Sequence, residues 1–101
     1  MNTDQIKNLP GAHHIIEGLR DLAANRHTIA SCLVRIAQHR LARTGLIKKD
    51  DQKDEGAELD LYALLAQEGN QAYSRYNSLI RELVSFEHAL DHLWSRSMAA
   101  K

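Results

Sequence analysis

The most restrictive feature of this sequence is a heptad pattern near its C-terminal end. Apolar residues recur at alternating intervals of four and three over three heptads: Ala72, Tyr76, Leu79, Leu83, Phe86, Leu90 and Leu93. This spacing predicts a long helix with one continuous apolar seam. Further apolar residues lie beside the seam: Tyr73, Ile80, Val84 and Trp94. They widen the apolar face, so we expect this helix to contact more than one neighbour.

The N-terminal half predicts two further helices, and the period-two alternation typical of strands is nearly absent from the chain. The first helix is expected to begin within Asn8–Gly11, with Pro10 in its first turn, and to end near Asn25, which tolerates a left-handed backbone. The second is expected to run from Thr28, a good N-cap, to Thr44.

The C-terminal half begins with a stretch dense in charge, which predicts an exposed loop at about residues 47–57. The segment ELDLYALLAQ then predicts a short helix over residues 57–68, which Gly69 and Asn70 either end or bend into the last helix. Neither half is long enough for a core of its own. We therefore predict one domain over residues 1–101, an all-α bundle of three or four helices with a long C-terminal helix.

Charge is balanced overall but divided along the chain. The sequence has 13 basic and 13 acidic side chains, so no net field favours nucleic acid or an anionic membrane. Residues 1–49 nevertheless hold eight basic and three acidic groups, whereas residues 50–101 hold five basic and ten acidic groups. Either the halves attract each other, within one fold or across a dimer, or the basic half presents a face to a polyanion.

Cysteine content and hydropathy indicate a cytoplasmic protein. Cys32 is the single cysteine, so an internal disulfide is impossible. The first residues, MNTDQIKNLPGA, lack the basic and apolar regions of a signal peptide. The longest apolar runs fall far short of the roughly 20 residues that span a bilayer, so no membrane partner is expected.

The last helix has more apolar surface than two short helices easily cover, which predicts self-association as a homodimer. The interface is predicted at the seam, and the alternative is that the whole seam is internal core. The seam residues in question are Tyr76, Leu79, Leu83, Phe86, Leu90 and Leu93.

Two histidine patterns raise the alternative of a metal-binding bundle. His88 and His92 lie four residues apart and share a helix face, although zinc needs at least one further ligand. The same H-x3-H motif, preceded in the chain by the H-x3-E motif of His13 and Glu17, resembles hemerythrin-like bundles, a likeness that implies two irons held inside four helices. The heptad register turns His88 and His92 toward solvent, so we expect neither a metal nor a cofactor.

A basic stripe on the second predicted helix supports the other alternative, a nucleic-acid-binding regulator. Arg35, His39 and Arg43 recur every four residues opposite the apolar face and could follow a phosphate backbone. Arg40 lies near the edge of the apolar face, where it is expected to extend toward water or to pair with an acid.

Catalytic motifs are absent from the sequence. The five glycines are scattered and form no phosphate-binding loop, and no serine stands in a nucleophile motif. We therefore interpret the chain as a small non-catalytic interaction or adaptor protein of unknown pathway. It is expected to form a homodimer and to bind a protein partner that the sequence does not identify.

Overall fold

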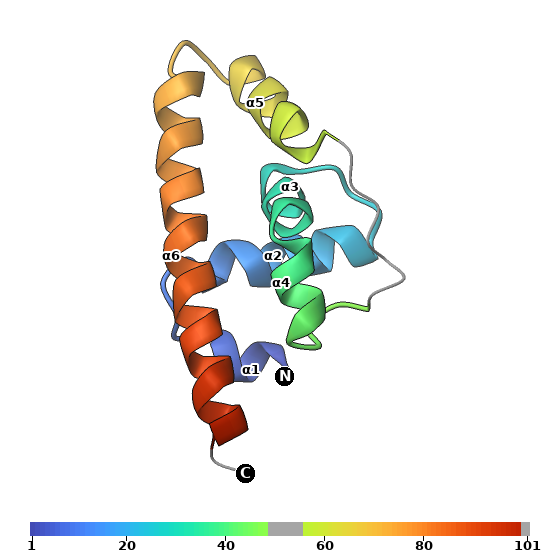
Figure 1. Ribbon diagram of the computed structural model, residues 1–101. Helices are drawn as coiled ribbons and strands as arrows, with labels where there is room; N and C mark the ends of the chain where they lie inside the picture. The colour runs from blue at the N-terminus through green and yellow to red at the C-terminus, as the bar shows by residue number, and fades with distance from the viewer. Residues whose placement is uncertain (49–55, 100–101) are drawn as a thin grey trace.

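The computed structural model describes residues 1–48 and 56–99, and it confirms an all-α fold: these residues form helices and turns without a strand (Figure 1). Residues 49–55 of the predicted charged loop lie outside the described residues. The helices are α1 (Thr3–Ile6), α2 (Ala12–Ala23), α3 (Ile29–Ile36), α4 (Gln38–Arg43), α5 (Ala57–Gln67) and α6 (Ala72–Ala99).

The long C-terminal helix sets the dimensions of the molecule. The 28 residues of α6 extend about 42 Å at 1.5 Å per residue. The longest dimension of the molecule is 48 Å, with 26 and 21 Å in the other directions. Figure 1 shows α6 running along this length, with α5 beside its N-terminal end and α1 beside its C-terminal part. The prediction of a long last helix is confirmed, and Gly69 and Asn70 separate it from α5.

The start of the first predicted helix is corrected by the structure. A short helix, α1, precedes it and is capped by Asn2, whose side chain accepts a hydrogen bond from the backbone N–H of Gln5. Pro10 lies outside both helices, because Gly11 adopts a left-handed backbone with φ of 74° and α2 begins only at Ala12.

The turn from α2 to α3 follows the sequence prediction. Asn25 has a left-handed φ of 58°, and Thr28 caps α3 through a reciprocal pair of hydrogen bonds with Ser31. The buried carboxylate of Asp21 accepts hydrogen bonds from the Thr28 hydroxyl at 2.6 Å and from Nε of Arg26 at 3.1 Å. These bonds fix the angle at which α3 leaves α2.

The second predicted helix is interrupted, contrary to the expected continuous helix. Ala37 separates α3 from α4, although its N–H still donates to the carbonyl of Leu33 and its carbonyl accepts from Leu41. No proline or glycine stands at this position, so the sequence gives no signal for the break. Ala37 and Gln38 are both buried there, and we attribute the turn to tertiary packing.

One apolar core joins both halves of the chain. Its largest fully buried members come from α1 to α6: Ile6, Ile15, Leu33, Val34, Leu41, Leu61, Leu65, Phe86 and Leu90. The helix α3 contacts α2 on one side and α5 on the other, and α5 contacts α6. The central residues of the C-terminal seam therefore belong to the same core as the buried residues of α2, α3 and α5.

Helices α2 and α3 approach each other closely at Gly18, in the middle of α2. A Cβ atom at this position would overlap the carbonyl oxygen of Ala30 and would lie 2.5 Å from Cγ2 of Val34. Only a hydrogen atom fits between α2 and α3 at this point, so the glycine sets their separation.

Replacing Gly18 with alanine should therefore destabilise the fold. Helix propensity alone would favour alanine by about 1 kcal/mol. Overpacking against a backbone carbonyl outweighs that gain, and we expect a net loss of about 1–3 kcal/mol in the free energy of unfolding. Urea denaturation followed by circular dichroism measures the change. A stabilised Gly18→Ala variant would contradict the close approach of α2 and α3.

Candidate functional site

The residues predicted as an interface are divided between the core and the surface. Leu83, Phe86 and Leu90 are buried against helices of their own chain. Tyr76, Leu79 and Leu93 are half-buried, and the first two also pack against the core. The seam is thus largely used within the chain, and less of it remains for a second copy than the sequence suggests.

Two of the four apolar residues beside the seam are more exposed than the seam itself, whereas Ile80 and Trp94 are half-buried. Tyr73 is 70% exposed and Val84 is 40% exposed, while Ile80 between them is half-buried. Together with Tyr76 they follow spacings of three, four and four, which keeps them on one narrow face of α6. The sequence predicts that Tyr73, Ile80 and Val84 widen the apolar face toward a further neighbour, and within the described chain Tyr73 and Val84 remain exposed.

Helix α5 extends this face. The Tyr62 ring contacts the Tyr76 ring edge-on, with centroids 5.7 Å apart. Leu59 precedes Tyr62 by three residues on the same face of α5 and is 77% exposed, while Tyr62 is 40% exposed. We call this surface the tyrosine strip; it consists of Leu59, Tyr62, Tyr73, Tyr76, Ile80 and Val84. No local sequence signal places α5 beside this part of α6, so the predicted interface does not include Leu59 and Tyr62.

On the C-terminal side of Val84, the same face of α6 carries acidic instead of apolar side chains. Glu87 and Asp91 stand one and two turns further on, and both face α4. Arg40 pairs with Glu87 at 3.2 Å and with Asp91, and Arg43 also pairs with Asp91. Helix α4 therefore covers the acidic part of this face, whereas Tyr73 and Val84 of the tyrosine strip remain exposed.

The basic stripe predicted for nucleic acid is compensated by carboxylates of the C-terminal half. Arg35 pairs with Asp60 of α5 at 2.9 Å, and Arg43 pairs with Asp91 of α6. His39 is exposed, and the break at Ala37 places it on a different helix from Arg35. The charge division of the sequence thus supports attraction between the halves within one fold, and it weakens support for a cationic face aligned on phosphates.

Among the carboxyl groups in these ion pairs, that of Glu87 has a pKa that is raised by its partial burial. Burial raises its pKa above the ordinary value of 4.5, and the nearby charge of Asp91 raises it further, while Arg40 and His88 act in the opposite direction. A raised pKa in the folded state means that folding favours the protonated carboxyl group. The contribution of Glu87 to stability is therefore greatest at low pH and declines as the pH rises through the window above 4.5.

A Glu87→Gln variant tests this sign. Glutamine does not titrate, so the wild-type chain should lose stability relative to the variant as the pH is raised from about 4 toward 7. Urea denaturation of both proteins over this range gives the difference in unfolding free energy. A difference that moves in favour of the wild-type chain with rising pH would show that ion pairing with Arg40 dominates over burial.

The histidines of the C-terminal helix lie where the heptad register placed them. His88 and His92 are both exposed. Within residues 1–48 and 56–99, the grouping of three potential metal ligands lies elsewhere, at His13, His14 and Glu82. Glu17, the predicted partner of His13, is exposed and is outside that grouping.

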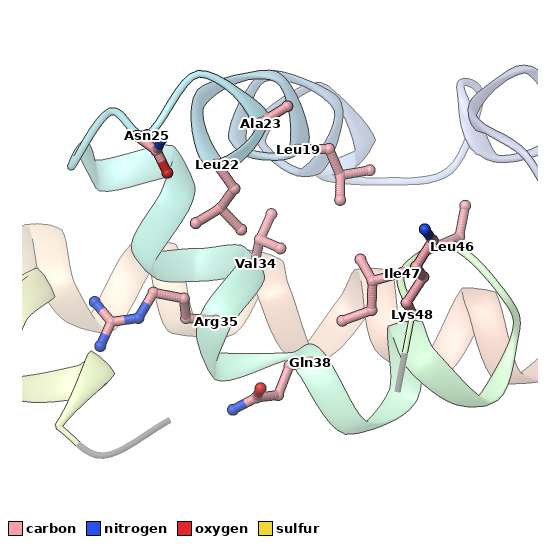
Figure 2. A pocket seen from close by; sticks show the side chains of 10 residues that line it. All are labelled: Leu19, Leu22, Ala23, Asn25, Val34, Arg35, Gln38, Leu46, Ile47 and Lys48. Carbon is pink, nitrogen blue, oxygen red and sulfur yellow. The ribbon is translucent and has the colours of Figure 1, made fainter. Parts of the chain in front are cut away.

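The single cysteine and a hollow beside α2 are two further features of the described chain. Cys32 is fully buried, which disfavours attack by its thiol on an external substrate. A hollow of about 610 Å³ lies between α2, α3 and the segment after α4, and Figure 2 shows Leu22 of α2 next to Val34 of α3 in its lining. Its lining is mainly apolar, with the charged side chains of Arg35 and Lys48 in addition. Such a surface suits apolar contact and supplies no pair of groups for acid–base chemistry.

Comparisons with known proteins identify no relative. Neither family models nor curated proteins match the sequence, and no solved structure matches the fold. Among the described helices, none combines the length and apolar content needed to cross a bilayer.

Proposed function

We propose that this chain is a small non-catalytic interaction protein that self-associates through the tyrosine strip. The observation that supports the proposal is the exposure of Tyr73, Tyr62 and Leu59 on two adjacent helices that are held together by the core. Tyrosine is favoured at interface hot spots because a large, stiff side chain buries much area at low entropic cost.

A second copy of the chain is the partner we favour. In a two-fold dimer the same surface meets itself, so the surface must be self-complementary. The tyrosine strip is compatible with this requirement because its six side chains are apolar or aromatic and none is charged, so two copies would meet without like-charge repulsion at the contact. The net charge of zero removes long-range repulsion between copies. In this arrangement two α6 helices would pack side by side over Tyr73, Ile80 and Val84.

Light scattering coupled to size exclusion tests the proposal. The wild-type chain should elute with twice the mass of one chain. The double variant Tyr73→Ser, Val84→Ser should dissociate at a protein concentration at least about tenfold higher than the wild type, because two interface anchors are lost. Its thermal stability as a monomer should change little, since both side chains are substantially exposed.

Met98 provides a matched control on the same helix. It is also apolar and exposed, but it lies near the end of α6, more than three turns beyond Val84. Met98→Ser should leave dimerisation unchanged. A wild-type chain that stays monomeric at high concentration, or a double variant that dimerises normally, would refute the tyrosine strip as the interface.

A further inference from the structure

We propose that His13, His14 and Glu82 form a binding site for one divalent transition-metal ion, specifically Zn²⁺. One potential ligand atom from each of the three residues lies within 4.8 Å of the other two. The two histidines belong to the first turn of α2, and the carboxylate belongs to the middle of α6. The site is independent of the tyrosine strip and involves none of its residues.

The distances need only side-chain adjustment to reach coordination geometry. In a tetrahedral site with bonds of about 2.0–2.1 Å, ligand atoms stand about 3.4 Å apart. Nε2 of His14 and Oε2 of Glu82 are already 2.9 Å apart. The His13 ring lies against the His14 ring, with centroids 4.0 Å apart, and it is exposed. Because the His13 side chain is exposed, it can rotate and bring a ring nitrogen closer to the ligand atoms of His14 and Glu82.

The backbone beneath the three side chains is held firmly. A Cβ atom at Gly11 would lie 3.1 Å from the carbonyl oxygen of Glu82 and 3.6 Å from Cβ of Phe86. The start of α2 is thus in close contact with α6 at the position that carries the carboxylate. Ala12 and Ile15, on either side of the histidine pair, are buried in the core. The ligands are therefore presented from fixed positions on two rigid helices.

The donor set suits zinc better than calcium or magnesium. Two imidazole nitrogens and one carboxylate oxygen are ligands that Zn²⁺ accepts, with a fourth position left for water. Calcium and magnesium prefer sites built from oxygen atoms alone. An ion bound here would replace the hydrogen bond between His14 and Glu82 and would link positions 68 residues apart in the sequence. Because the unfolded chain does not hold these residues together, zinc should stabilise the folded state.

Calorimetric titration of the full, untagged chain with Zn²⁺ tests the site, with the visible spectrum of bound Co²⁺ as a second readout. We expect one ion per chain and a spectrum typical of a four- or five-coordinate ion. His14→Ala and Glu82→Gln should each weaken Zn²⁺ binding at least about tenfold. Zinc should raise the melting temperature of the wild-type chain but not that of Glu82→Gln.

The exposed pair on α6 supplies the control. The double variant His88→Ala, His92→Ala removes two surface imidazoles from the same helix and should bind Zn²⁺ like the wild type. Glu82→Gln changes an exposed side chain and should fold, as circular dichroism would verify. Absence of saturable one-to-one binding, or binding lost in the His88 and His92 variant but kept in Glu82→Gln, would overturn the proposal and leave an ordinary surface ion pair.

Discussion

The contact between α2 and α3 at Gly18 is the constraint on which the rest of this fold depends. Because only a hydrogen atom separates the two helices there, they approach more closely than larger side chains permit. The bonds of Asp21 with Arg26 and Thr28 then fix the turn that joins them. The helix α3 also packs against α5, and α5 packs against α6, so the long C-terminal helix is positioned through α5 and through the apolar core that all of these helices share.

Ion pairs between the two halves of the chain add to the contacts made by the apolar core. The basic half of the sequence supplies Arg35, Arg40 and Arg43, and the acidic half supplies Asp60, Glu87 and Asp91 as their partners. Exposed ion pairs contribute little individually, typically less than about 1 kcal/mol each. Their consequence for function is larger, since arginines paired within the chain are less available to phosphate. In the tyrosine strip, Tyr73 and Val84 remain exposed within the described chain, which directs attention to contacts between proteins.

The sequence predicted the elements better than their junctions. Heptad spacing identified α6, and capping chemistry identified Thr28 and Asn25. Leu83, Phe86 and Leu90, which were predicted as part of an interface, are instead buried in the core of their own chain. Nothing in the local sequence marks the break at Ala37, which we attribute to packing between segments. The candidate surfaces needed the fold for the same reason: the contact of Tyr62 with Tyr76, and that of His14 with Glu82, join residues whose proximity depends on tertiary structure.

The central claim is that compensated charge covers one part of α6 and leaves the tyrosine strip to contact another copy of the chain. Amide hydrogen exchange of the wild-type chain, measured at low and high protein concentration, tests it most directly. The account predicts that protection rises with concentration around Tyr73, Ile80 and Val84, and stays constant in α3 and α4. Concentration-dependent protection confined to α3 and α4, or none anywhere along α6, would contradict it.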